Sequence, residues 1–278
     1  MRQPGIILLP FFAGMLLIAC SEDDPVTPEN PTVLQADQQY YPLLRGSEWQ
    51  YRFDTTGTDG MPMTGVYLQT SRIEGTREID GIVYTVQVNE TDNGTDVFTD
   101  SLFFRKTGEG LYATTATLRF ASLFPGLPNL PIDIPEEIAI LQYPLETVRD
   151  WMIFEFEFRP IPFFAYYFRI EALNRGTETY QGEWKTYYDC RKIRITADAV
   201  LPNPEDPTNF LDPLVINETA DFWFLPTGGL VAGDGSALIF ALLQGRGELT
   251  FSQATVHQEL LGMNIVQPAD TCGVIAAR

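Results

Sequence analysis

One pattern of residues occurs twice along the chain, and it restricts the fold more than any other feature. Tyr41-Pro42-Leu43 precedes Trp49 by the same spacing with which Tyr143-Pro144-Leu145 precedes Trp151. Further matches follow in the same order: Arg72-Ile73-Glu74 with Arg169-Ile170-Glu171, Asp80-Gly81 with Gln181-Gly182, Phe103-Phe104 with Trp223-Phe224, Thr107-Gly108 with Thr227-Gly228, and Gly110-Leu111 with Gly229-Leu230. Because the matching residues occur in the same order in both halves of the chain, they predict two related copies of one unit. Coincidence of common strand and turn residues is the alternative.

Alternation of apolar and polar residues identifies the unit as a β-meander. Trp49, Tyr51 and Phe53 alternate with polar residues, and so do Phe154, Phe156 and Phe158. Such period-two alternation is typical of a strand with one packed face and one solvated face. Other strand candidates are Ile82 to Val88, in which Ile82, Tyr84, Val86 and Val88 alternate with Val83, Thr85 and Gln87, and residues 97–104, 109–118, 183–196, 215–225 and 247–265.

Few segments compete with this interpretation. Pro135-Glu136-Glu137 resembles a short helix start, and the period of the apolar run 237–243 decides nothing. Strands are not separated by long amphipathic helices, which argues against an α/β protein. The predicted fold class is all-β, with antiparallel meander sheets in two related copies that form an open barrel or a sandwich.

The predicted organisation has five parts. They are a lipoprotein signal peptide at 1–19, a lipidated cysteine with a flexible tether at 20–40, a first β-meander at 41–118, a Pro-rich connector at 119–142, and a second β-meander with a C-terminal tail at 143–278. The tether assignment rests on Pro25, Pro28 and Pro31 among polar residues, which favour a semi-extended chain.

The first twenty residues have the pattern of an export signal. Arg2 precedes an apolar run that is too short to span a bilayer comfortably and that Pro10 and Gly14 interrupt. The run ends in Leu17-Ile18-Ala19-Cys20, which resembles the lipobox of bacterial lipoproteins. An ordinary signal peptide, or a membrane anchor with a chance cysteine, is the alternative.

The lipobox resemblance implies that Cys20 is acylated and becomes the first residue of the mature protein. Two or more acyl chains, such as palmitate, hold a protein stably at a membrane where one chain is marginal. Ser21 resembles the residue that directs lipoproteins to the outer membrane, and the acidic run that follows resembles a surface-export signal. The expected location is therefore the outer membrane, on its periplasmic face or at the cell surface.

The mature chain also resembles secreted bacterial lipoproteins with a β-rich, half-open-barrel body. The resemblance is carried by Tyr41-Pro42-Leu43, Gly46, Trp49 and Tyr51, and by Trp223-Phe224 with Gly229-Leu230-Val231. These are turn and core residues. The resemblance therefore implies an architecture and transfers no catalytic residue.

The charge balance excludes one class of partner. The chain has 37 acidic and 18 basic residues, for a net charge of −19. A general nucleic-acid binder needs a basic face for phosphates, so we expect no nucleic-acid partner. With 45% hydrophobic residues the chain can still bury a core.

Three cysteines leave one pair once Cys20 is assigned to the anchor. Cys190 and Cys272 would then form a disulfide in an oxidising compartment, which would tie the C-terminal tail to a strand. Two unpaired thiols are the alternative. No Cys-x-x-Cys occurs, so zinc and redox chemistry have no support.

No residue cluster predicts catalysis, a metal or a cofactor. His257 is the single histidine, and the sequence shows no nucleophile that would accompany it in a triad. Glu155 and Glu157 share one strand face, but alternation places that face opposite the phenylalanines and in solvent. Residues 89–96 hold many oxygen ligands without the order of a calcium loop, and a hairpin turn at Asn93-Gly94 explains them.

An aromatic stretch after residue 153 has two interpretations. Its members are Phe154, Phe156, Phe158, Phe163, Phe164 and Tyr166. They could line an apolar ligand cavity in an open barrel, or they could form ordinary core, which every β-domain must bury.

The sequence therefore favours a membrane-anchored, non-enzymatic lipoprotein with a binding or structural role at the cell envelope. Its expected partners are the membrane, through the lipid, and an apolar ligand or an envelope protein. A carrier or chaperone of a lipid-like ligand in a half-open barrel is the alternative. A hydrolase that uses carboxylates is a third hypothesis, and the sequence shows no facing carboxylate pair for it.

Overall fold

A computed structural model describes residues 40–57, 59–62, 66–116, 134–161, 164–203, 206, 209, 211–244 and 254–266. The chain separates into two compact units, Met1–Pro31 and Thr32–Arg278. Every described residue lies in the second unit.

The described residues form twelve strands and one short helix. In chain order the elements are β1 (Glu48–Thr56), β2 (Tyr67–Ile79), β3 (Ile82–Asp92), β4 (Val97–Lys106), β5 (Gly110–Thr114), β6 (Glu137–Gln142), β7 (Asp150–Ile161), β8 (Phe164–Gln181), β9 (Thr186–Leu201), β10 (Leu214–Leu225), β11 (Gly229–Ser236), α2 (Ala237–Gln244) and β12 (Thr255–Asn264). The predicted all-β class is confirmed.

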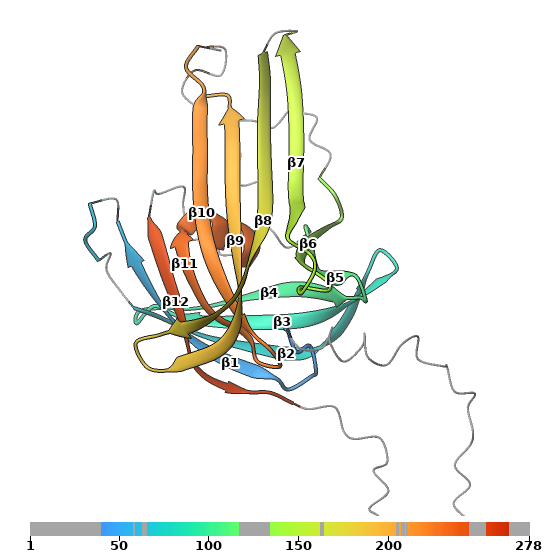
Figure 1. Cartoon of the computed structure of the whole chain (residues 1–278), viewed down its shortest axis with the longest axis vertical. Coiled ribbons are helices and arrows are strands. Elements are labelled where there is room, and N and C mark those ends of the chain that lie inside the picture. Colours follow the sequence, from blue (N-terminus) through green and yellow to red (C-terminus); the bar gives the residue numbers. More distant parts are fainter. Residues whose placement is uncertain are drawn as a thin grey trace, which may run out of the picture. The chain divides into compact units, whose positions relative to one another are not determined.

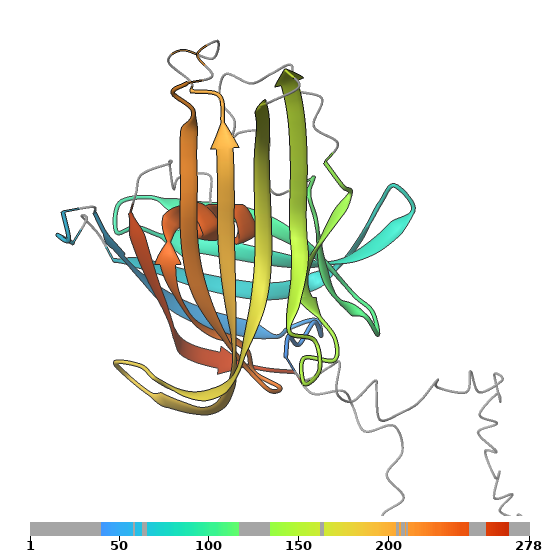
Figure 2. The ribbon, with the colours of Figure 1, turned by 45° about the horizontal axis from the view of Figure 1, so that its top comes forward.

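All twelve strands belong to one antiparallel sheet that is nearly closed into a barrel (Figures 1 and 2). The spatial order is β6-β5-β4-β3-β2-β1-β12-β11-β10-β9-β8-β7. Strands that follow each other in the chain pair with each other, except β6 and β7, which do not. In addition β12 pairs with β1, which joins the first and last strands of the sheet. Consequently the two edge strands, β6 and β7, come from the middle of the chain.

The seam between β6 and β7 is bridged by a tryptophan. The indole Nε1 of Trp151, at the start of β7, donates a hydrogen bond of 3.0 Å to the carbonyl oxygen of Ala139 in β6. The matched residue, Trp49 in β1, donates one of 2.6 Å to the carbonyl oxygen of Gly228, in the β10–β11 turn. Both indoles are buried, so each needs such an acceptor.

Short polar turns connect the strands as the sequence predicts. Asp80 and Gly81 have φ angles of 51° and 82°, and a two-residue turn with positive φ at both positions matches the twist of the flanking strands. At Asn93-Gly94 the Asn93 side-chain oxygen accepts the backbone N–H groups of Thr95 and Asp96. The hairpin turn predicted at Asn93-Gly94 is therefore confirmed, and Asp80-Gly81 forms the turn between β2 and β3.

The repeated residues occupy corresponding strands. The Trp49 and Trp151 motifs open β1 and β7, and the two Arg-Ile-Glu motifs lie in β2 and β8. Two boundaries differ from the predictions. Residues 137–142, assigned to a Pro-rich connector, form β6, because their backbone pairs with β5. The helix start expected at Pro135-Glu136-Glu137 is wrong for the same reason.

Alternation sorts the side chains of β7 between the two faces of the sheet as expected. Phe154 and Phe156 are buried, and Phe154 packs against Phe168 of β8 with ring centroids 5.9 Å apart. Glu155 and Glu157 are exposed and pair with Arg169 and Arg159 at the surface. The Glu155 and Glu157 carboxylates therefore face solvent beside cations rather than each other across a cleft.

The apolar run 237–243, which periodicity left undecided, forms helix α2. Its seven residues are all buried, as expected for a helix that is apolar on every side. Ser236 caps it by accepting the N–H of Leu238 at 3.2 Å. The ring of Phe240 packs against Gly233 of β11. Any larger residue at position 233 would clash, because its Cβ would lie 2.7 Å from that ring. Within the described residues, no helix has the length and apolar character needed to cross a bilayer.

Candidate functional site

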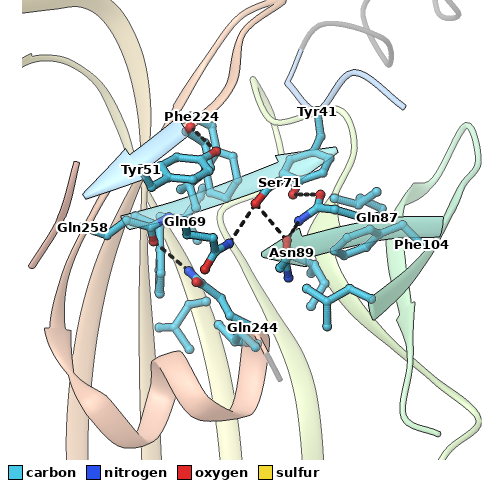
Figure 3. Close-up of a pocket in the computed structure, with 18 residues that line it drawn as sticks. Tyr41, Tyr51, Gln69, Ser71, Gln87, Asn89, Phe104, Phe224, Gln244 and Gln258 are labelled. Atoms are coloured by element: carbon cyan, nitrogen blue, oxygen red, sulfur yellow. Dashed lines mark hydrogen bonds between the residues drawn. The ribbon is translucent and has the colours of Figure 1, made fainter. Parts of the chain in front are cut away.

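A cavity of about 60 Å³ lies inside the barrel, between the inner faces of β2 and β3 and the end of α2 (Figure 3). A single water molecule needs roughly 10–15 Å³ by this kind of measure, so the cavity has room for several waters or for a small chemical group. Side chains from both copies of the meander line it, together with Leu243 and Gln244 of the helix.

A ladder of uncharged polar side chains forms one wall. Gln69 and Ser71 of β2 lie beside Gln87 and Asn89 of β3, and all four are buried. Gln69 Nε2 donates to Ser71 Oγ at 2.8 Å, and Ser71 Oγ donates to Asn89 Oδ1 at 2.8 Å. Gln87 Nε2 donates to the same Asn89 oxygen at 2.9 Å. The two strands are thus joined inside the barrel by side chains as well as by backbone.

The ladder ends on three further partners. The Tyr41 hydroxyl donates to Gln87 Oε1 at 2.8 Å, and Asn89 Nδ2 donates to Asp100 Oδ1 at 2.8 Å. The Thr91 hydroxyl reaches Gln69 Oε1 at 3.5 Å. A buried amide without partners is costly, whereas a connected network holds each of its members in one orientation. We call the uncharged members of this set, Tyr41, Gln69, Ser71, Gln87, Asn89 and Thr91, the amide ladder; the carboxylate of Asp100 is a charged partner outside it.

The opposite wall is apolar. It is formed by the inward side chains of β9 and β10 with Leu230 of β11 and Leu243 of α2: Ile193, Ile195, Phe222, Phe224, Leu230 and Leu243. All six are buried. A cavity with one apolar wall and a few fixed polar groups has the usual composition of a small-molecule site.

Two further glutamines lie at the end of the helix. Gln244, the last residue of α2, donates through Nε2 to Oε1 of Gln258 in β12 at 2.7 Å. Gln258 is only 1% exposed, so its amide is inside the protein. Figure 3 shows this Gln244–Gln258 pair beside Gln69, at the other side of the cavity from Gln87.

The cavity is electrically neutral. None of the 18 residues that line it is an aspartate, glutamate, lysine, arginine or histidine. Burial raises the pKa of Tyr41 and of Tyr51 well above the usual value for tyrosine, so both phenols are uncharged. A charged group that entered the cavity would lose its hydration without gaining a counter-ion.

The predicted cysteine sites fall largely outside the described residues. This applies to Cys20 and to Cys272. Cys190 lies in β9 as a buried free thiol, and burial raises its pKa to about 11. The disulfide between Cys190 and Cys272 remains a prediction.

The aromatic stretch contributes to the core of the second copy, away from the residues that line the cavity. Phe154, Phe156 and Tyr166 are buried, Phe158 packs against the core, and Phe164 contacts the ring of Tyr166 edge-on at 4.9 Å. Phe163 lies outside the described residues. Most of the cavity-lining residues are instead on β2, β3 and β4, with β9, β10 and α2 opposite; the others are Tyr41, Tyr51, Leu111, Ile140, Leu230 and Gln258.

His257 is a strand histidine, as expected. It lies in β12, where its Nδ1 is 3.4 Å from Asp234 Oδ1, and this carboxylate raises the pKa of the histidine. Across the part of the chain that the structure describes, no group of three or more His, Cys, Asp and Glu side chains could hold a metal ion.

The amide ladder is the feature that sequence reasoning missed. In β3 the prediction that Val86 and Val88 lie on the packed face and Gln87 on the solvated face is wrong. Gln87 and Asn89 are buried and face the barrel interior, while Val86 and Val88 are half-buried on the outer face. A signal was present: Gln69 and Ser71, like Gln87, Asn89 and Thr91, recur with period two. Such a polar stripe ordinarily indicates the solvated face of a strand.

Comparisons with known proteins add no family assignment. No protein-family model matches the chain, and no curated protein matches it. A crystal structure of a "putative lipoprotein" from Parabacteroides distasonis is 12% identical, with a TM-score of 0.44, over 81% of this chain and 99% of that one. A "putative exported protein" with a YmcC-like fold from Bacteroides fragilis is also 12% identical, with a TM-score of 0.40 over the same shares. TM-scores below 0.5 carry no argument about function.

Proposed function

We propose that this chain is a lipid-anchored, non-enzymatic protein of the cell envelope whose barrel binds a small uncharged molecule. One observation carries the proposal: a neutral cavity inside the barrel places ordered amide groups opposite an apolar wall. Buried polar groups cost free energy unless they are bonded, so six uncharged side chains devoted to one internal network call for an explanation. Ligand recognition explains both the network and the space beside it.

The chemistry of the lining supports binding rather than catalysis. The lining residues include a serine, but its hydroxyl already donates to Asn89 and has no histidine or lysine as a base. Glycoside hydrolysis by carboxylates uses a pair of them at the substrate, and the 18 lining residues include none. The amide ladder can orient a ligand and has no group that would transform it.

The anchor is proposed from the sequence. Leu17-Ile18-Ala19-Cys20 supports acylation at Cys20, and Ser21 supports sorting to the outer membrane. Replacing Cys20 with alanine should release the protein from the membrane fraction and remove the label after growth with radioactive palmitate. Retention of the C20A variant in membranes, with unchanged mass, would contradict the anchor and leave the binding proposal intact.

Native mass spectrometry tests the binding function. The mature chain from Ser21 onward, produced without acyl groups, retains every described residue. We expect it to carry a co-purified neutral molecule that is lost on unfolding. A long-chain lipid in its place would favour the carrier hypothesis, and a protein that is empty after purification from envelope extract would contradict ligand binding.

A further inference from the structure

The Gln244–Gln258 pair differs from the amide ladder because its hydrogen bonding is incomplete. In the ladder, Asn89 Oδ1 accepts two bonds and Nδ2 donates a third. The two glutamines share a single bond, from Gln244 Nε2 to Gln258 Oε1. Within the described part of the chain, Gln244 Oε1 and Gln258 Nε2 have no hydrogen-bond partner, although Gln258 is 1% exposed.

The unused groups of this pair are one acceptor and one donor. Exchanging the oxygen and nitrogen positions in both amides reverses the shared bond and again leaves one of each. Another carboxamide satisfies both at once, because it accepts through its oxygen and donates through its N–H, on two separate atoms. A hydroxyl or a water molecule can also do both, but through one oxygen atom. A carboxylate only accepts and an ammonium only donates, so each would leave one glutamine group unsatisfied.

The residues around the Gln244–Gln258 pair restrict the chemical class of the ligand further. The 18 lining residues offer no charge to a carboxylate or an ammonium, and burying an ion without a counter-ion is unfavourable. Leu243 and Phe222 lie on the apolar side of the cavity, where the hydroxyls of a sugar would lose hydration without replacement. The cavity of about 60 Å³ fits an amide head with a few carbon atoms.

We infer that the cavity recognises an uncharged amphiphile through a carboxamide head, with Gln244 and Gln258 bonded to the amide and the β9–β10 wall in contact with its apolar substituent. This inference rests on the proposed binding function. It names the chemical class of the ligand and assigns the two glutamines as its binding residues. The amide ladder then acts as the rigid frame that holds the opposite side of the site.

A series of probes with one tail and different heads tests the inference. The probes are pentanamide, 1-pentanol, pentanoate and pentylamine at pH 7, added to the mature chain labelled with nitrogen-15. We expect pentanamide to bind at least tenfold more tightly than pentanoate or pentylamine. Pentanol, which donates and accepts through one atom, should lie between them. The side-chain amide signals of Gln244 and Gln258 should shift on binding pentanamide.

The double variant Gln244→Leu/Gln258→Leu supplies the second arm. Removing both amides leaves no buried amide unpaired, so the barrel should keep its fold, and its preference for pentanamide over pentanol should disappear. Gln50→Leu is the matched control, because Gln50 is exposed on β1 and its amide contacts Glu48. This control should bind like the unmodified chain.

The possible outcomes separate the two proposals. Equal binding of all four probes by the unmodified chain would overturn the amide inference and leave small-molecule binding in place. A selective chain whose preference survives in the double variant would also overturn the assignment of the two glutamines. Failure to bind any probe, with an empty protein in native mass spectrometry, would overturn the binding function itself.

Discussion

The two copies of the meander line the same barrel with opposite chemistry. The Arg-Ile-Glu motifs align Ile73 with Ile170, and strand pairing then matches Asn89 with Ala199. All the inward positions of these strand pairs are buried. The full set of matched positions is Gln69 with Tyr166, Ser71 with Phe168, Ile73 with Ile170, Gln87 with Ala197, Asn89 with Ala199, and Thr91 with Leu201.

The comparison shows that the same pairing of antiparallel strands can have either polar or apolar side chains on its inner face. Antiparallel pairing depends on backbone groups, which are the same in both copies, and the side chains decide only what fills the space. Strands β2 and β3 of the first copy satisfy their buried polar groups with one another, whereas the matched positions on β8 and β9 are filled by Tyr166 and by apolar side chains. The cavity lies where the two solutions meet, since two unlike walls interlock less completely than a uniform core.

The largest loss of stability should follow from placing an asparagine of the first copy at the matched position of the second copy. Ala199→Asn introduces an amide between Phe168 and Ile216, its neighbours across the strands. The added volume and the unpaired amide should together lower the free energy of unfolding by about 3–4 kcal/mol. Urea denaturation measures this effect. Ala165→Asn, on the half-exposed face of β8, is the control and should cost far less.

The reverse exchange should have the next largest effect. Asn89→Ala gives the first copy the residue of the second and removes the partners of Ser71, Gln87 and Asp100. We expect a loss of about 2–3 kcal/mol in the same measurement. Asn217→Ala, at an exposed position of β10, should change stability little. A stability for Asn89→Ala equal to that of the unmodified chain would show that the amide ladder is not an ordered network.

The matched tryptophans should respond alike. Trp49→Phe and Trp151→Phe each remove an indole N–H that donates to a backbone carbonyl. Each should cost about 1–2 kcal/mol, because the acceptor is left unpaired and a small void remains. Trp184→Phe is the control, since Trp184 is 60% exposed. A much larger loss for Trp151 alone would show that the β6–β7 seam is the weaker closure.

The smallest effect concerns the pairing of β11 with β12, where His257 faces Asp234 and has no counterpart in the first copy. Asp234 raises the pKa of His257 in the folded protein. The protonated histidine therefore stabilises the fold below pH 6.5, and this contribution is lost as the pH rises through the raised pKa. Both side chains are partly exposed, so Asp234→Asn should lower stability by only a few tenths of a kcal/mol at pH 5. Denaturation curves of the unmodified chain and of Asp234→Asn at pH 5 and pH 8.5 measure the difference in stability. An equal effect of the substitution at both pH values would show that the His257–Asp234 ion pair does not stabilise the fold.

Much of the fold was predictable because its signals are local. Alternation of Trp49, Tyr51 and Phe53 indicates a strand, and Asp80-Gly81 favours a tight turn through its own backbone preferences. Strand β6 was not predictable from the same kind of signal. Its six residues follow prolines, and they become a strand by pairing with β5 and occupying the sheet edge.

The site was less predictable than the fold because burial is not a local property. Gln87 and Asn89 have the pattern of a solvated face, and only closure of the sheet turns that face inward. Gln244 and Gln258 are 14 residues apart and meet because α2 lies against β12. The aromatic stretch from Phe154 had the stronger sequence signal for a ligand site, and its described members pack in the core.

The amino-acid sequence alone determined the strands, the hairpin turns and the twofold repetition, because each depends on residues close together in the chain. The tertiary structure decided that β12 pairs with β1, that the polar stripe of β2 and β3 faces inward, and that two distant glutamines share one bond. These features depend on which face of the curved sheet becomes the inside, and that choice minimises the free energy of the whole barrel rather than of any one strand.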